Sequence, residues 1–219
     1  YVRTVYQHPE MDVGGALLNI ETDDYMGAWV YEDRLKYFLE DPTLQKHYDA
    51  LDKYFKYEAN IRLIGYDSQG TKAVVYVSSH NKPGAYYIYN FAAKSLEELV
   101  SSEPTLEDKL NSSGRIMQIP LRDGATISAY HYYPTGRQSG APLLVMPHGG
   151  PHVRDTFTFD YWAQYFVARG YQVVQMNFRG SDGYGRDFER AGYGEWGGLM
   201  YEDITDTVKY FHAQNLSLP

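Results

Sequence analysis

The sequence contains no cysteine, and this absence excludes several kinds of protein at once. Its 219 residues cannot form a disulfide framework, a thiolate zinc site or a cysteine nucleophile. No run of about 18 apolar residues occurs, so we expect no membrane-spanning helix. The longest apolar runs, such as residues 143–146, have the length of a strand. The net charge is −8 with scattered acidic residues, which argues against a nucleic-acid partner because such a partner needs a clustered basic face.

Two further patterns are missing. The Gly-x-Ser-x-Gly pattern that surrounds a nucleophilic serine does not occur, and Arg179 stands where the first glycine would precede Ser181. Ser181 also lacks a strand directly before it and a helix directly after it in the expected structure. The histidines lack metal-ligand spacing, so we expect no metal or cofactor. Those considered are His8, His47, His80, His131, His152 and His212.

What is present indicates a globular protein in two parts. Hydrophobic residues make up 43% and charged residues 22% of the chain. Residues 1–110 contain short β-rich runs separated by turn sequences at 67–70 and 81–84, a spacing typical of an antiparallel meander. One helix interrupts them, since Pro42 is a helix-starting residue and Leu44, Tyr48, Leu51 and Phe55 follow at helical spacing. The expected strands are 28–31, 61–66, 72–78 and 85–90.

A polar stretch at 94–114 is interpreted as a linker containing a short helix at 105–110. The pattern changes after it. A hairpin is predicted at 115–133 around the turn 122–124, followed by strands at 142–147 and 171–176. Helices are predicted at 157–168, ending at Gly170, and at 200–214. This order indicates an α/β unit with a parallel or mixed sheet covered by helices.

The strongest local signal is His148-Gly149-Gly150-Pro151, which follows an apolar strand and precedes a helix. Two glycines leave room for a substrate to approach the backbone. A free N–H at such a strand end can point at a developing oxyanion. We therefore interpret this turn as an oxyanion loop on a strand inside the sheet, in preference to a plain strand-to-helix turn.

The segment 177–185 (Asn-Phe-Arg-Gly-Ser-Asp-Gly-Tyr-Gly) follows the next strand, where open α/β sheets place their sites. It matches neither nucleotide-binding glycine pattern. Arg179 could orient a substrate carbonyl or carboxylate, but we favour a structural ion pair with an acidic residue such as Asp203. The glycine-rich segment 192–198 is expected to pack closely under Trp196, without chemistry of its own.

Together these segments resemble the prolyl oligopeptidase family of serine peptidases, in its acylaminoacyl-peptidase and dipeptidyl-aminopeptidase-like branch. The matching segments are 142–151, 169–174, 177–185, 194–198 and the pair Glu202-Asp203, and they occur in the order found in the family. Residues 83–89 resemble the last blades of the family's β-propeller. The resemblance implies the first half of an α/β-hydrolase domain at 111–219, preceded by the last propeller blades at 1–110.

The resemblance also implies which site residues this chain carries. Gly150 would donate its backbone N–H to the oxyanion, with His148 and Gly149 shaping the loop; Arg179 is the substrate-binding candidate. The triad Ser, Asp and His would lie beyond Pro219, and the natural N-terminus before Tyr1. We therefore expect a peptide substrate, an inactive isolated fragment, and the remainder of the catalytic domain or another copy of the chain as partner.

Two alternatives stay open. An esterase or lipase could use the same fold and loop, although Pro151 stands where a third glycine would suit that function. A non-catalytic binding module would explain the missing serine, but a glycine-shaped oxyanion loop has no evident use without a nucleophile.

Overall fold

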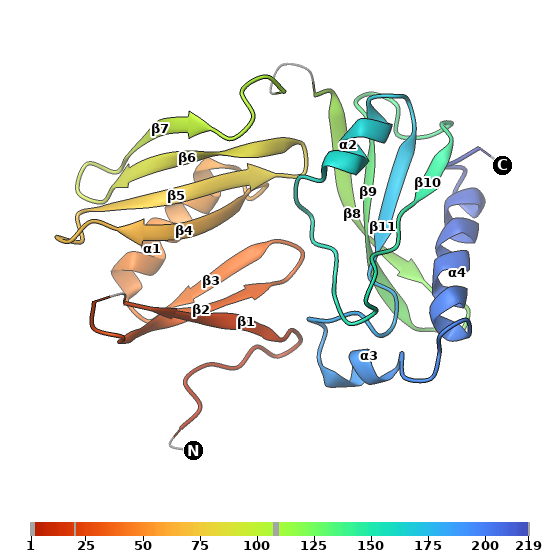
Figure 1. Ribbon diagram of the computed structural model, residues 1–219, viewed down its shortest axis with the longest axis horizontal. Helices are drawn as coiled ribbons and strands as arrows, with labels where there is room; N and C mark the ends of the chain where they lie inside the picture. Colours follow the sequence, from red (N-terminus) through yellow and green to blue (C-terminus); the bar gives the residue numbers. More distant parts are fainter. Residues whose placement is uncertain (1–2, 20, 107–109, 219) are drawn as a thin grey trace. The chain divides into compact units, whose positions relative to one another are not determined.

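The computed structural model describes residues 3–19, 21–106 and 110–218, and the chain divides into two compact units at Lys109/Leu110. Figure 1 shows the order of the elements. In the first unit, β1 (Val13–Leu18), β2 (Tyr25–Tyr31) and β3 (Leu35–Leu39) form a three-stranded antiparallel sheet. After α1 (Pro42–Tyr54), a second antiparallel meander contains β4 (Asn60–Tyr66), β5 (Lys72–Ser79), β6 (Lys82–Asn90) and β7 (Ser95–Ser101).

The predicted helix in this unit is confirmed, and its start has a clear physical cause. The Asp41 side chain accepts a hydrogen bond from the Thr43 N–H, while Pro42 occupies the first turn, where no N–H donor is needed. Tyr48 and Leu51 are buried on the inner face of α1, and the Tyr48 hydroxyl donates to the Leu35 carbonyl at 3.1 Å. The helix therefore packs on the sheet as its apolar stripe predicts.

The predicted linker at 94–114 is wrong. Residues 95–101 form β7, and 112–114 begin the long strand β8 (Ser112–Pro120). β7 reads as polar because it is the edge strand of its sheet, and Glu97 and Glu98 are exposed there. The helix predicted at 105–110 includes residues 107–109, which lie outside the described residues. The turn predicted at 81–84 is shorter, because Lys82, Pro83 and Gly84 already belong to β6.

The second unit is built on a mixed sheet, as predicted. Its strands are β8, β9 (Thr126–Pro134), β10 (Leu143–Val145) and β11 (Gln172–Met176), in the spatial order β10-β11-β9-β8. β10 and β11 run parallel and the other neighbours antiparallel. The predicted hairpin closes between Leu121 and Ala125, with Gly124 at φ +88°, a conformation that favours glycine.

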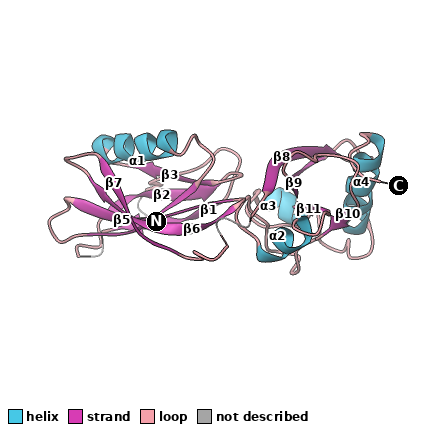
Figure 2. Cartoon of the chain, turned by 90° about the horizontal axis from the view of Figure 1, so that it is seen from above, coloured by secondary structure: helices cyan, strands magenta, loops and turns pink. Residues whose placement is uncertain are grey.

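Alternating side chains place apolar groups on both faces of this sheet. Tyr130 and Tyr132 of β9 face α2 (Tyr161–Val167) through Phe157, whereas Ala129 lies in the core cluster that contains Phe211 of α4 (Leu199–Ala213). The helices thus cover opposite faces (Figure 2). α2 is shorter than the helix predicted at 157–168, because the Asp160 side chain caps it by accepting from the Ala163 N–H. A short helix, α3 (Arg186–Arg190), was not predicted.

A polar chain crosses the sheet at His131, which is fully buried. Its Nε2 donates to Gln172 Oε1 at 2.8 Å, and Arg115 Nε donates to its Nδ1 at 3.3 Å. The Gln172 amide in turn donates to the carbonyls of Ala141 and Leu216. Nδ1 can accept from Arg115 only while it carries no hydrogen, so both hydrogen bonds of the ring require a neutral imidazole. Burial favours this form and lowers the pKa of His131 to about 4.

We expect this burial to make the second unit less stable in mild acid. The unfolded chain binds a proton at His131 near pH 6.5 but the folded chain only near 4. As the pH decreases from 6.5 to 4, the free energy of unfolding should therefore fall by up to about 1.4 kcal/mol per pH unit because of this group. Nuclear magnetic resonance of the His131 ring should show titration near pH 4, and His131→Gln should lose this part of the pH dependence. A ring that titrates near 6.5 in the folded protein would contradict the assignment.

Candidate active site

The site is built at the carboxyl ends of β10 and β11. Because these strands are parallel neighbours, with Leu143 opposite Gln172 and Val145 opposite Val174, the segments that follow them leave the sheet side by side. We call residues 146–160 the first loop and residues 177–185 the second loop. One expectation is corrected here: among the described residues β10 is an edge strand rather than an interior one, joined on its other side only by a bridge between Ala141 and Ser217.

The turn predicted to receive an oxyanion is open to solvent. Gly149 and Gly150 are exposed, and within the described part of the chain neither N–H has a hydrogen-bond acceptor. Gly150 has φ +119°, and a Cβ there would lie 2.8 Å from the backbone nitrogen of His152. A Cβ on Gly149 would meet nothing within 4 Å. The backbone conformation therefore favours glycine at position 150. At position 149 the lack of a side chain leaves open space beside the N–H groups of the two glycines.

His148 is held by three contacts at once. Its Nδ1 lies 2.9 Å from the Gly149 carbonyl oxygen, and its Nε2 lies 2.9 Å from Ser181 Oγ. The ring stacks on Phe178 with centroids 4.6 Å apart. Burial lowers the pKa of His148, which favours the neutral imidazole.

The pairing of Ser181 with His148 was missed by the sequence analysis, because 33 residues separate the two positions. A serine beside an imidazole can form a nucleophilic pair. Here Ser181 is fully buried, and its hydroxyl donates to the Phe178 carbonyl at 2.6 Å. A buried hydroxyl tied to its own loop cannot reach a substrate, so the pair is a structural contact between the two loops.

Further hydrogen bonds join the loops along their length. The Asn177 side chain accepts from the Asp155 N–H at 2.8 Å and donates to the Asp155 carbonyl at 3.1 Å. The Asp182 N–H donates to the Val153 carbonyl at 3.1 Å, and His152 Nδ1 donates to the Gly180 carbonyl at 2.9 Å. The first loop is therefore supported from His148 to Asp155 by the second.

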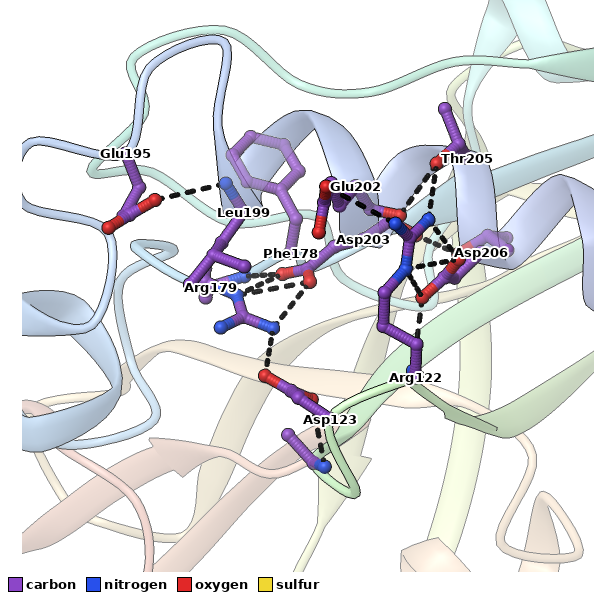
Figure 3. Close-up of polar contacts among 12 residues, drawn as sticks. Arg122, Asp123, Phe178, Arg179, Glu195, Leu199, Glu202, Asp203, Thr205 and Asp206 are labelled. Atoms are coloured by element: carbon purple, nitrogen blue, oxygen red, sulfur yellow. Dashed lines mark hydrogen bonds and ion pairs between the residues drawn. The ribbon is translucent and has the colours of Figure 1, made fainter.

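The second loop is itself anchored through Arg179 (Figure 3). The guanidinium donates to both oxygens of Asp203 at 2.7–3.0 Å and to Asp123 Oδ2 at 2.8 Å, and the Arg179 N–H also donates to Asp203. The side chains of Arg179 and Asp203 are 11% and 1% exposed. The ion pair with Asp203 favoured from the sequence is confirmed, and the separate hydrogen bond from Arg179 to Asp123 lowers the pKa of Asp123. A substrate contact by Arg179 stays a prediction.

The packing expected beneath Trp196 is wrong, since this side chain is 76% exposed. The close contact in that segment is made by Gly192 instead. A Cβ on Gly192 would lie 2.6 Å from the Cα of Gly180. The two glycines therefore let the second loop and the chain after α3 touch backbone to backbone.

Asp155 is a half-buried acid in the first loop. Burial, followed by the nearby Asp160 carboxylate, raises the pKa of Asp155 to about 7, and Arg154 opposes the shift. Its Oδ2 atom is buried and has no hydrogen-bond partner among the residues that the structure describes. An uncharged carboxyl group suits this position, because an unpaired buried charge is costly.

Two properties of the described residues bear on other classes of site. No group of three or more His, Asp or Glu side chains is arranged to hold a metal ion within this part of the chain. Among the same residues, no helix combines the length and apolar character that a bilayer span requires.

Comparison with known proteins assigns part of the second unit to a family. Residues 157–218 match the model of the prolyl oligopeptidase family. These residues belong to that family. The resemblance predicted from the sequence is thus confirmed.

Individual relatives agree with this assignment. The chain is 31% identical to dipeptidyl aminopeptidase BIII of Pseudoxanthomonas mexicana over 97% of its own length and 32% of that protein. It is 31% identical to dipeptidyl peptidase family member 6 of Caenorhabditis elegans over 66% of its length and 22% of that protein. Acylaminoacyl peptidase of Pyrococcus horikoshii shares the fold with a TM-score of 0.66 at 19% identity, over 95% of this chain and 32% of that one. The chain therefore spans about a third or less of these relatives.

The anchor at Arg179 should dominate the stability of the second unit. Asp203→Asn leaves a nearly buried guanidinium without its main partner, so we expect a loss of about 3–5 kcal/mol in the free energy of unfolding. Its neighbour Glu202 pairs with Arg122 at 3.2 Å in an exposed position. Glu202→Gln should therefore cost at most about 1 kcal/mol. Equal losses in the two variants, measured by denaturant unfolding, would contradict the role given to the buried pair.

For Asp155 we expect stability to depend on pH in the direction opposite to that for His131. Its pKa is about 7 when folded and about 3.9 when unfolded, so the charged form destabilises the fold as pH rises between these values. Asp155→Asn should raise the free energy of unfolding at pH 8 by on the order of 3 kcal/mol and change it little at pH 4. The exposed Asp182→Asn should change it by less than about 0.5 kcal/mol at either pH. A destabilised Asp155→Asn protein at pH 8 would refute this reading.

Proposed function

We propose that the chain is part of a serine peptidase and supplies the oxyanion-binding loop of its active site. The observation that carries the proposal is the pair of exposed N–H groups at Gly149 and Gly150, free of acceptors among the described residues, at the end of a parallel strand. Attack on a peptide carbonyl places negative charge on its oxygen, and preorganised backbone N–H groups stabilise that charge. We assign this role to the Gly150 N–H, with Gly149 leaving space for the substrate.

The nucleophile belongs elsewhere in the proposed enzyme. The chain has no Gly-x-Ser-x-Gly, and Ser181 is buried. We propose that the serine, aspartate and histidine of the triad come from the remainder of the catalytic domain, so that these 219 residues alone are inactive. The open side of β10 supports this proposal. A further parallel strand could pair there and bring a nucleophile to the same end of the sheet as the Gly150 N–H.

The first unit fits the same proposal. Its four-stranded antiparallel meander, β4 to β7, and the three strands before it have the form of propeller blades. We propose that residues 1–110 are the last blades of a β-propeller and residues 111–219 the first half of an α/β-hydrolase domain. The dipeptidyl aminopeptidase that aligns with 97% of the chain covers both units, which supports a common origin with such an enzyme.

The proposed substrates are short peptides with free dipeptidyl or acylated N-termini. This choice rests on the names of the similar proteins, which include a dipeptidyl aminopeptidase and an acylaminoacyl peptidase. The acyl-enzyme mechanism requires only that the peptide carbonyl reach the Gly150 N–H and the serine together.

A serine-directed fluorophosphonate tests the proposal. We expect it to label the full-length protein that contains this chain and to leave the isolated 219 residues unlabelled, because only the former carries the nucleophile. Mass spectrometry should place the label in a Gly-x-Ser-x-Gly peptide, and the labelled protein should no longer cleave dipeptidyl arylamides. A label on Ser181, or an unlabelled full-length protein, would refute the proposal. Hydrolysis of short acyl esters without hydrolysis of arylamides would indicate an esterase instead.

A further inference from the structure

Val153 exposes an apolar side chain directly beside the proposed oxyanion donor. The residue is 47% exposed. A Cβ atom placed on Gly150 would lie 3.2 Å from Val153 Cγ2 and 3.3 Å from the Val153 nitrogen. The Gly150 N–H has no acceptor among the described residues. A substrate residue whose carbonyl oxygen accepts from this N–H is therefore placed next to the valine methyl groups.

The backbone of Val153 is fixed on both sides of its side chain. Its N–H donates to the Pro151 carbonyl at 2.9 Å, and its carbonyl accepts from the Asp182 N–H at 3.1 Å. Rotation about χ1 is also restricted in valine, because two methyl groups branch from its Cβ. The position of these methyl groups is thus set before a ligand binds, so little conformational entropy is lost when an apolar group packs against them.

The polar side chains on either side of Val153 are engaged by the second loop. His152 Nδ1 donates to the Gly180 carbonyl at 2.9 Å. The Arg154 guanidinium lies 4.2 Å from the centre of the Tyr184 ring and donates to the hydroxyl of that residue at 3.0 Å. These contacts hold both polar side chains to the second loop. The side chain that the first loop leaves beside the free N–H is the apolar one.

The two glycines of the turn therefore have different surroundings. A Cβ on Gly149 would meet nothing within 4 Å, whereas Gly150 has Val153 as a close neighbour. The peptide group of a substrate can enter through the open space at Gly149, while one of its side chains contacts the valine. Apolar walls with a few placed hydrogen-bonding groups are the usual composition of a ligand pocket.

We propose that Val153 is a specificity-determining residue, which forms one wall of a subsite for an apolar side chain on one of the two residues at the scissile bond. The proposal rests on the proposed function, because the carbonyl of that bond is the group assigned to the Gly150 N–H. It deepens that function by naming a substrate class, which is peptides with an apolar residue such as leucine at this bond. Packing against the valine removes apolar surface from water, which favours leucine over glycine.

The test compares kcat/KM for leucine and glycine on each side of the scissile bond in the full-length protein. Dipeptidyl arylamides vary the residue before the bond, and tripeptides with a constant first half vary the residue after it. We expect a preference for leucine at one of the two positions. Val153→Ser should reduce this preference by about 10-fold, as expected when a pocket loses an apolar contact. The position at which the preference falls identifies the substrate residue that occupies the subsite.

Two further variants separate a lost contact from a damaged fold. Val153→Ile keeps an apolar side chain and should retain the preference for leucine. Val13→Ser makes the same change as Val153→Ser at a 42% exposed valine of the first unit, so it should leave the preference as it is. An equal loss on leucine and glycine substrates in Val153→Ser would overturn the proposal, and so would an unchanged preference at both positions.

Methyl nuclear magnetic resonance spectra of the full-length protein give a result that does not require activity. N-acetylleucinamide should shift the Val153 methyl signals in a saturable manner, and N-acetylglycinamide should not. The Val13 methyl signals should respond to neither compound. Absence of a leucine-dependent shift at Val153 contradicts the subsite even in an active peptidase. An inactive protein that fluorophosphonate does not label, but that shows this shift, refutes the proposed function and leaves the subsite standing, so the two failures are distinguishable.

Discussion

The parallel pairing of β10 with β11 is the constraint on which the candidate site depends. Three residues of β10 pair with three of β11, and Val173 and Val174 in the latter are fully buried. Parallel neighbours end at the same edge of a sheet, so the loops after them emerge together. The hydrogen bonds described above between the two loops, from His148 to Asp155, are all made with residues that follow β11. A shift of one residue in this pairing would carry the glycines away from their support.

The electrostatics of the site follow from burial. The Arg179 charge is matched by Asp203 and Asp123 at 3.0 Å or less, so it contributes little field toward the glycines. Burial favours the neutral forms of His148 and Asp155. The glycines themselves present the partial positive charge of N–H groups that have no acceptor among the described residues, which is the kind of charge that the proposed oxyanion role requires.

Local chemistry let much of the fold be predicted from the sequence. The strand at 72–79 buries every second side chain, and the helix after Asp41 carries its own cap and apolar stripe. The glycine loops could be placed because each follows an apolar run. β7 could not be recognised, since an exposed edge strand has a polar sequence, and the start of α2 depends on which acidic residue accepts the cap hydrogen bond. Such choices are made by tertiary contacts, which a local pattern does not contain.

The candidate site shows the same division between local and tertiary information. Gly150 could be singled out because its left-handed conformation and the turn around it are local properties. The hydrogen bond from His148 to the adjacent carbonyl is also local, but it exists only while the ring is held by Phe178 and Ser181, which the fold brings from about 30 residues away. The surroundings of this turn thus combine a contact between adjacent residues with contacts that only the parallel pairing of β10 and β11 brings together.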